Sequence, residues 1–312
     1  MESDTTTRRG PPKIVFIVPY RDRANHLNVF RVMMTHLLED YDPNSYEIFF
    51  AHQDDKRPFN RGGMKNIGFM AVRYKYPHAY RDITFVFNDV DTVPSTKGLI
   101  NYETTRGVIK HFYGVRFALG GIFSITGHDF ELINGFPCYW SWGYEDNVLN
   151  RRALTSGLTI DRSTFFQIGD SSILQTVDSY VKAVNKRHKE EMRNDDGRDG
   201  VSTITNVQYE FDDAQSSAMG TFIHISSFES IHKIEHERMA DYDLMRNKYV
   251  KGSGSPMLFG NIQEQKQERK QERVPQINPH HPHPRPNVRL HPHPPQHPPS
   301  GGRSRGLVFL GR

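Results

Sequence analysis

The sequence predicts an α/β fold, in which a doubly wound, mostly parallel and twisted sheet is flanked by helices. Three apolar runs rich in β-branched and aromatic residues, 13–18, 46–52 and 83–87, have the pattern of buried strands. The segments 23–38 and 64–74 between them space their apolar residues as helices do. Parallel sheets of this kind bind ligands beyond the carboxyl ends of their strands. We therefore expect functional side chains directly after each of these three strands.

Candidate binding residues, most of them charged or aromatic, follow all three expected strands. They are Pro19, Arg21 and Arg23 after the first strand, Phe59 and Arg61 after the second, and Asp89 and Asp91 after the third. Helix N-termini and guanidinium groups both favour phosphate. Carboxylates at positions i and i+2 of an extended segment point to the same side, which suits a divalent cation bound to a diphosphate. Each motif alone is also typical of a solvated surface; their joint placement favours a phosphate and metal site.

Later segments add a glycine pair and a tryptophan-rich loop. Gly120 and Gly121 permit a close approach of backbone. A helix is expected at 126–134, and strands at 206–211 and 221–226. The segment 135–147 holds both tryptophans of the chain and two acidic residues. We expect a loop that stacks a sugar ring on an indole while carboxylates bond its hydroxyls; burial of both tryptophans in the core is the alternative.

Length, cysteine content and hydropathy limit the class of protein to which the chain can belong. A chain of 312 residues allows one large or two small domains. No apolar stretch approaches the roughly 18 residues of a membrane helix, and we expect no transmembrane segment. The single cysteine, Cys138, fits a reducing compartment. We expect a cytoplasmic protein, with a fragment trimmed of its membrane anchor as the alternative.

The positive net charge of +4 lies in the last part of the chain. From residue 261 onward there are nine Lys and Arg against three Asp and Glu, which leaves 31 against 33 in residues 1–260. The part expected to fold has no basic excess, so we expect it to bind no nucleic acid.

Composition divides the chain into a flexible N-terminus at 1–12, a folded domain at 13–250 and a tail at 251–312. The tail has a Gln/Glu/Lys/Arg run and then a Pro/His-rich stretch that holds ten of the nineteen prolines, so we expect it to be disordered. Its histidines could hold a transition metal weakly, and its apolar end at 307–310 could dock on an unknown partner. An interaction arm on a structural domain is therefore a further interpretation.

Taken in order, the motifs resemble the β-1,4-galactosyltransferase family (glycosyltransferase family 7) over roughly residues 13–228. This resemblance implies a GT-A type nucleotide-diphospho-sugar transferase fold and an enzyme that transfers a hexose from a UDP-sugar with inversion. The matching segments are 19–23 (Pro-Tyr-Arg-Asp-Arg), 59–62 (Phe-Asn-Arg-Gly), 85–91 (Phe-Val-Phe-Asn-Asp-Val-Asp), 135–147 (Gly-Phe-Pro to Trp-Ser-Trp-Gly-Tyr-Glu-Asp-Asn) and 199–204 (Asp-Gly-Val-Ser-Thr-Ile).

The resemblance also implies a role for each candidate residue. Asp146 would be the general base, Glu145 would bond the acceptor, and Trp142 would close over both sugars. Asp91 would bind the metal, Mn²⁺ with Mg²⁺ as the alternative. The UDP-sugar would be held by Pro19, Arg21, Arg23, Phe59, Arg61, Asp89, Gly120 and Gly121. The implied reaction moves galactose or N-acetylgalactosamine (GalNAc) to a saccharide hydroxyl through a β-linkage, β-1,4-like, and the acceptor's identity stays open.

Three positions depart from the family pattern. The family's Met-x-x-His or paired histidines are absent after the Trp loop, where Asp170 or Gln175 could serve as oxygen ligands instead. Asn147 replaces an acidic residue of the Glu-Asp-Asp run. Ala118 stands where galactose-specific members keep a bulky Tyr, which leaves room for a UDP-GalNAc donor. The missing ligands motivate the alternative function, a catalytically inactive sugar- or nucleotide-binding module of the same fold.

Overall fold

The computed structural model describes residues 10–212 and 219–250. The expected tail at 251–312, and the expected flexible N-terminus at 1–12 up to residue 9, lie outside the described residues. Among the residues described, no helix is long and apolar enough to cross a membrane.

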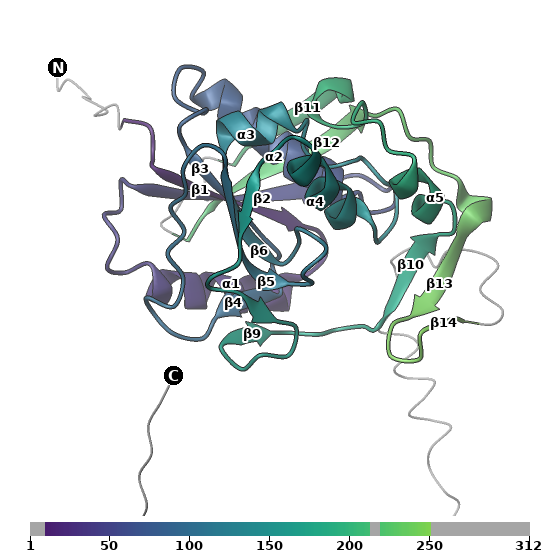
Figure 1. Cartoon of the computed structure of the whole chain (residues 1–312), viewed down its shortest axis with the longest axis horizontal. Helices are drawn as coiled ribbons and strands as arrows, with labels where there is room; N and C mark the ends of the chain where they lie inside the picture. The colour runs from purple at the N-terminus through teal and green to yellow at the C-terminus, as the bar shows by residue number, and fades with distance from the viewer. Residues whose placement is uncertain (1–9, 213–218, 251–312) are drawn as a thin grey trace, which may run out of the picture. The chain divides into compact units, whose positions relative to one another are not determined.

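The described residues form one large mixed sheet with helices on both faces (Figure 1). Its strands follow the order β11-β12-β2-β1-β3-β6-β5-β7, with β8 beside β5. Their bounds are β1 (Ile14–Tyr20), β2 (Tyr46–Gln53), β3 (Thr84–Asn88), β5 (Val108–Gly114), β6 (Ile122–Thr126), β7 (Thr159–Asp161), β8 (Phe166–Gln167), β11 (Thr205–Phe211) and β12 (Thr221–Glu229).

Five helices and two small sheets complete the described part. The helices are α1 (Ala24–Leu37), α2 (Arg61–Lys75), α3 (Gly127–Leu132), α4 (Glu145–Thr155) and α5 (His188–Arg193), with short 3-10 turns at Val201–Thr203 and His236–Arg238. One small sheet pairs β4 (Thr92–Pro94) with β9 (Ile173–Gln175). The other joins β10 (Val181–Asn185), β13 (Met239–Asp243) and β14 (Lys248–Tyr249).

The sheet is mostly parallel, as expected, but it contains antiparallel pairs that the sequence patterns did not indicate. Strands β2, β1 and β3 run parallel, and β12 joins β2 in parallel. Strand β6 runs antiparallel to both β3 and β5, and β11 is antiparallel to β12. The antiparallel β6 lies next to β3, so the Gly120-Gly121 turn before β6 reaches the carboxyl end of β3.

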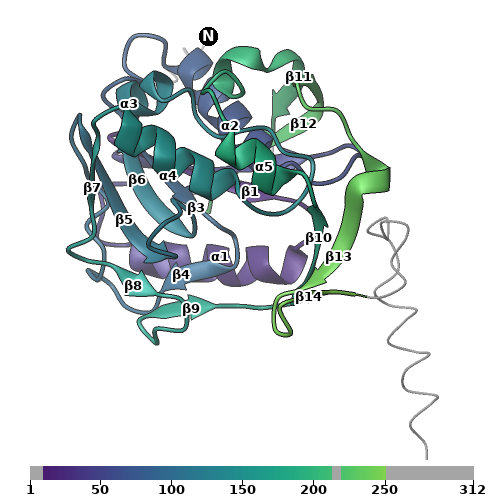
Figure 2. The ribbon, with the colours of Figure 1, turned by 45° about the vertical axis from the view of Figure 1, so that its right-hand side comes forward.

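Alternating side chains of the central strands build a core on each face of the sheet. Val15 and Ile17 of β1 pack into a core with α2, α3 and α4. Their neighbours Phe16 and Val18 pack into a second core with α1. Figure 2 shows α1 on one side of the sheet, and α2, α3 and α4 on the opposite side. Because both faces are covered, functional groups are left at the strand ends.

Two predicted boundaries were displaced in ways that matter for the site. Helix α2 begins at Arg61 rather than at residue 64, because the Asn60 side chain accepts a hydrogen bond from the Gly63 N–H at 2.7 Å and caps the helix. Helix α4 begins at Glu145, inside the segment expected to be a loop. Both shifts place a charged residue on the first turn of a helix that points to the edge of β3.

Candidate active site

Three carboxylates converge on one guanidinium group at the carboxyl end of β3. Arg61, the first residue of α2, lies with Nη1 3.0 Å from Asp89 Oδ2 and with Nε 2.8 Å from Glu145 Oε1. Its Nη2 also pairs with Asp146 Oδ2. Asp89 directly follows β3, and the other two acids are the first residues of α4. Contacts between residues 28, 84 and 85 positions apart thus form one charged cluster. We call its acidic members, Asp89, Glu145 and Asp146, the carboxylate cluster.

Lys65 supplies a second cation to the same cluster. Its Nζ lies 3.4 Å from Asp89 Oδ1 and 3.5 Å from Asp146 Oδ1, and the side chain is 1% exposed. Sequence reasoning missed this residue. The available signal was its spacing of four from Arg61, which places both cations on one face of a helix, but that signal required the helix to begin at Arg61 rather than at residue 64.

Burial and charge act differently on the two aspartates of the cluster. Burial opposes ionisation of Asp89, yet Arg61 and Lys65 outweigh it and hold the pKa of that carboxyl below its ordinary value. Burial raises the pKa of Asp146, and the neighbouring Glu145 and Asp89 raise it further, against the pull of the same two cations. A carboxylate with a raised pKa is the better proton acceptor, so Asp146 has the stronger basic character of the two.

The glycine pair allows the close approach that its sequence indicated. A Cβ atom on Gly120 would lie 2.4 Å from Asp146 Oδ2. Gly121 has φ +69°, and a Cβ there would lie 2.4 Å from the Tyr113 carbonyl oxygen. The Asp89 N–H donates to the Gly121 carbonyl at 3.0 Å, so this turn also fixes the end of β3. Only residues without a side chain fit at both positions.

The two tryptophans have different environments. Trp140 is 4% exposed, stacks on Phe228 with ring centroids 5.1 Å apart and belongs to the core. Trp142 is 39% exposed, and its backbone N–H donates to the Ala183 carbonyl of β10 at 2.9 Å. Of the pair expected to stack a sugar, Trp142 alone presents an accessible ring.

One carboxylate oxygen of Glu145 accepts no hydrogen bond from the described residues. Its side chain is 2% exposed, and Oε1 is bonded to Arg61. Oε2 is buried and has no hydrogen-bond partner among the described residues. A buried carboxylate oxygen without a partner costs free energy, and a ligand hydroxyl would satisfy it.

Asp91 lies beside a second guanidinium group. Arg23 Nη1 is 3.7 Å from Asp91 Oδ2 and 3.2 Å from Asp178 Oδ2. Strand β9 brings the second segment here, because Thr92 pairs with Gln175 and the Thr176 N–H donates to the Asp91 carbonyl at 2.8 Å. Asp178 was not among the residues expected from the sequence, since only the pairing of β4 with β9 places it here.

The oxygen donors around Asp91 fit a hard divalent cation in type. The described residues contain no cluster of three or more His, Cys, Asp or Glu that could hold a metal. Asp91, Asp178 and the Gln175 amide offer carboxylate and carbonyl oxygen, which Mn²⁺ and Mg²⁺ accept. Burial and the neighbouring Asp89 raise the pKa of Asp91, so its charge is only partly compensated by the protein. Asp170 uses Oδ1 to accept from the Ser172 N–H at 2.9 Å in an exposed loop.

The remaining donor-site candidates lie around the same edge of the sheet. Arg21 donates to the carbonyls of Arg57 and, at 2.7 Å, of Asp55, so it holds the loop after β2 rather than facing the carboxylates. Pro19 is buried within β1. Phe59 is partly buried against the core. Ala118 is half-buried and precedes Leu119, whose N–H donates to the Asp146 carbonyl at 2.9 Å.

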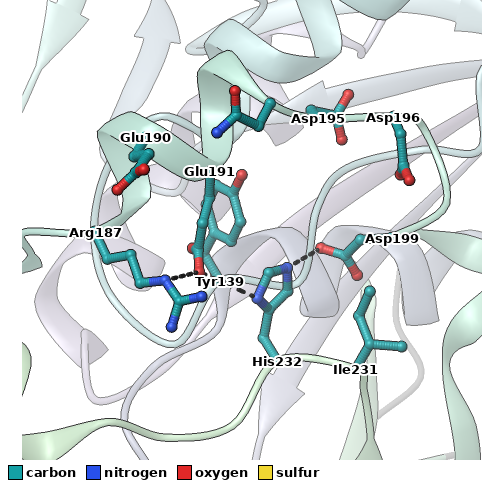
Figure 3. A pocket seen from close by; sticks show the side chains of 10 residues that line it. Tyr139, Arg187, Glu190, Glu191, Asp195, Asp196, Asp199, Ile231 and His232 are labelled. Carbon is teal, nitrogen blue, oxygen red and sulfur yellow. Dashed lines mark ion pairs between the residues drawn. The ribbon is translucent and has the colours of Figure 1, made fainter.

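A pocket of about 340 Å³ is lined by Tyr139, by residues of and flanking α5, and by Asp199, Ile231 and His232 (Figure 3). Its lining is acidic, and it includes His232, whose Nε2 lies 2.8 Å from Asp199 Oδ2. Tyr139 in its wall stacks on His188 at 4.2 Å, and the His188 ring hydrogen-bonds the Ser141 hydroxyl at 2.9 Å. The pocket therefore borders the loop that carries Trp142, and the carboxylate cluster does not line it.

Comparison with known proteins supports the same interpretation of the fold. The model of the N-terminal region of glycosyl transferase group 7 matches residues 6–102, and the model described as the N-terminal domain of galactosyltransferase matches residues 109–176. Together these matches cover more than half of the chain.

Curated relatives carry related names. The xylosylprotein 4-beta-galactosyltransferase of Caenorhabditis elegans is 29% identical over 219 residues, which are 65% of this chain and 73% of the worm protein. Beta-1,4-galactosyltransferase 1 of Mus musculus is 30% identical over 162 residues, which are 49% of this chain and 39% of the mouse protein.

A solved structure shares the fold. The catalytic domain of Drosophila beta-1,4-galactosyltransferase 7, in complex with xylobiose, superposes with a TM-score of 0.54 at 22% identity and covers 69% of this chain and 94% of that one. The architecture is thus that of the GT-A type glycosyltransferases. Within that class, the chain belongs to the β-1,4-galactosyltransferase family, glycosyl transferase group 7.

Proposed function

We propose that this chain is an inverting, metal-dependent glycosyltransferase. It moves a hexose, galactose or GalNAc, from a UDP-sugar to a hydroxyl of a saccharide acceptor and forms a β-linkage, β-1,4-like. The observation that carries the proposal is the convergence of the carboxylate cluster on Arg61 at the strand edge. The names of the relatives support it, as does a Drosophila neighbour solved as a mutant with manganese, UDP-Gal and xylobiose.

The proposed chemistry is a single displacement. Asp146 takes the proton of the acceptor hydroxyl as that oxygen attacks the anomeric carbon. The bond from this carbon to the diphosphate oxygen breaks, and UDP leaves from the opposite face. An α-linked donor therefore gives a β-linked product. The unpartnered Oε2 of Glu145 accepts a hydrogen bond from a second acceptor hydroxyl and orients the sugar.

Arg61 has to release Asp146 before that carboxylate can act as a base. A guanidinium group binds phosphate in a bidentate, charge-assisted manner. The diphosphate of the donor therefore offers Arg61 a competing partner and leaves Asp146 free. Asp89 stays paired with Lys65 and is placed to contact the donor sugar.

Asp91 would hold the divalent metal, Mn²⁺ with Mg²⁺ as the alternative. When bound, the metal neutralises the charge that builds on the leaving diphosphate. Ala118 would face the C2 group of the donor sugar, where its small side chain leaves room for an acetamido group.

The experiment that tests the function is UDP release from UDP-Gal, UDP-GalNAc, UDP-GlcNAc and UDP-Glc, with Mn²⁺ or EDTA and with or without monosaccharide acceptors. Release that depends on Mn²⁺ and on one or two donors supports the transferase. Strict use of UDP-Gal would contradict the role given to Ala118. Binding of UDP that is insensitive to Mn²⁺, with no release from any donor, would favour the inactive sugar- or nucleotide-binding module instead.

The general base has its own test. Asp146→Asn keeps the shape of the side chain and removes its basicity, so transfer should fall by at least about 100-fold while UDP affinity stays near that of the wild type. Steady-state kinetics and UDP titration measure the two quantities. Asp82→Asn, the same substitution at an exposed carboxylate outside the site, serves as the matched control and should leave transfer unchanged. Equal turnover in Asp146→Asn would remove the assignment.

We also propose that the enzyme works in the cytoplasm. Cys138 is buried and free, and it is the only cysteine of the sequence, so the fold needs no disulfide. Microscopy of the tagged full chain would show a diffuse cytoplasmic signal. A Golgi pattern would contradict the proposal.

A further inference from the structure

Arg23 lies beside two carboxylates, Asp91 and Asp178, that come from distant segments of the chain. Arg23 Nη1 lies within 4 Å of both Asp91 Oδ2 and Asp178 Oδ2. All three side chains are partly exposed, at 26%, 28% and 39% for Arg23, Asp91 and Asp178. A hydrated ion can therefore reach the point where the guanidinium now lies.

The backbone, and not Arg23 alone, holds the two acidic segments together. Strands β4 and β9 pair in antiparallel register, with Thr92 opposite Gln175. The Thr176 N–H then donates to the Asp91 carbonyl at 2.8 Å, directly before the chain reaches Asp178. The approach of the two acidic segments is thus fixed by backbone pairing and does not depend on Arg23.

We infer that Asp178 is the second protein ligand of the divalent metal, beside Asp91, and that Arg23 occupies the cation position when no metal is bound. The inference rests on the proposed function and names the residue that replaces the family's missing Met and His ligands. Asp170 and Gln175, the substitutes expected from the sequence, are less suited. Asp170 turns into its own exposed loop, and the Gln175 carbonyl oxygen accepts from the Tyr113 hydroxyl at 2.9 Å.

The assignment predicts opposite effects for two substitutions that break the same ion pair. Asp178→Asn removes a ligand charge and should weaken metal binding. Arg23→Gln removes one of two competing cations, the other being Lys182, and should strengthen it. If Asp178 merely positioned Arg23, both substitutions would change the metal affinity in the same direction.

The test is a titration of the full chain with Mn²⁺ alone, without nucleotide, in which electron paramagnetic resonance measures free Mn²⁺. We expect Asp178→Asn and Asp91→Asn each to raise the dissociation constant by at least about tenfold. Arg23→Gln should lower it, and Asp170→Asn, which also removes one carboxylate from this region, should leave it unchanged. Circular dichroism and thermal unfolding check that each variant is folded.

Three results would overturn the inference: wild-type affinity in folded Asp178→Asn, weaker binding in Arg23→Gln, or no Mn²⁺ binding by the wild-type chain. UDP release by the wild type separates this failure from that of the proposed function. If the wild type turns over a donor while Asp178→Asn binds Mn²⁺ normally, the transferase stands and the ligand assignment fails. If the wild type neither binds Mn²⁺ nor releases UDP, both fail.

Discussion

At the scale of single residues, Arg61 decides the charge balance of the site. It faces three acidic side chains that are 16%, 2% and 16% exposed, and it is itself 20% exposed. Buried charges are tolerated only when each is paired. Lys65 reaches two of the acids, so loss of Arg61 would leave Glu145 without a cationic partner and two aspartates with one shared lysine.

Replacing Arg61 by Met should therefore destabilise the protein as well as weaken donor binding. We expect a loss of about 3 kcal/mol in the free energy of unfolding at pH 7, because breaking a buried pair leaves an uncompensated charge. The loss should be smaller at pH 5, where carboxylates freed from Arg61 take up protons. Urea unfolding at both pH values measures this. Arg246→Met, at an ion pair that is 73% exposed on the Arg side, is the control and should change stability by less than about 0.5 kcal/mol. Equal effects of the two substitutions would contradict the prediction.

Gly120 lies directly against the proposed base, Asp146. A methyl group there would lie 2.4 Å from Asp146 Oδ2 and must displace that carboxylate. We expect Gly120→Ala to lower kcat by about 100-fold, because small misplacements of a reacting group are costly, while the protein remains folded. Gly10→Ala, where nothing lies within 4 Å of the added atom, is the control. Wild-type kcat in Gly120→Ala would show that Asp146 tolerates the displacement.

At the scale of elements, sequence patterns were most informative for strands that are buried on both faces. The apolar runs of β1, β2 and β3 indicated these strands because both faces of the sheet are covered. Strands β10, β13 and β14 form a half-exposed sheet without clear alternation, so no pattern indicated them. The start of helix α4 at Glu145 was not predicted, because Gly143 and Tyr144 before it carry no usual capping signal. Tyr144 is the N-cap residue and adopts φ +73°.

Candidate residues followed the same rule. Arg61, Asp89 and Asp146 could be found because each belongs to a recognisable local motif. Predicting Lys65 at the site required the correct start of α2. Predicting Asp178 required the pairing of β4 with β9, which joins segments some 80 residues apart. Local patterns carry no information on such pairings, so residues that reach the site only through them were missed.

His111 links β5 to the glycine turn and should make stability depend on pH. Arg162 Nε donates to its Nδ1 at 3.1 Å, so Nε2 carries the proton and faces the carbonyls of Tyr113 and Gly120 at 3.1 and 3.2 Å. Burial, together with Arg162, lowers the pKa of His111 to about 4. Since this pKa is lower in the folded than in the unfolded chain, the unfolded state takes up the proton first, and stability falls as the pH drops from about 6.5 towards 4.

We expect this one group to cost on the order of 2 kcal/mol between pH 7 and pH 5. Urea unfolding of wild type and His111→Gln at both pH values measures it, because the glutamine cannot titrate and should flatten the pH dependence by that amount. His78→Gln, at an exposed position, is the control and should keep the wild-type slope. The same slope in His111→Gln would show that another group causes the acid sensitivity.

At the scale of the whole molecule, both hydrophobic cores, the carboxylate cluster and the Asp91 region lie within residues 10–250. The charge counts change at nearly the same place, because residues 1–260 hold 31 basic and 33 acidic side chains while the last 52 residues hold nine and three.

Deleting residues 261–312 should therefore turn a net positive chain into a slightly negative one and leave the fold and the chemistry unchanged. We expect kcat/KM with a small acceptor to stay within about twofold and the melting temperature within a few degrees, since none of the described contacts is removed. An anion-exchange column would confirm the change in charge, and the donor assay would measure turnover. If the truncated chain remained folded but lost transfer to small acceptors, the tail would be part of the catalytic machinery. If it lost transfer only to its larger natural acceptor, the tail would act in acceptor recruitment, and the site at the edge of the sheet would keep its proposed role.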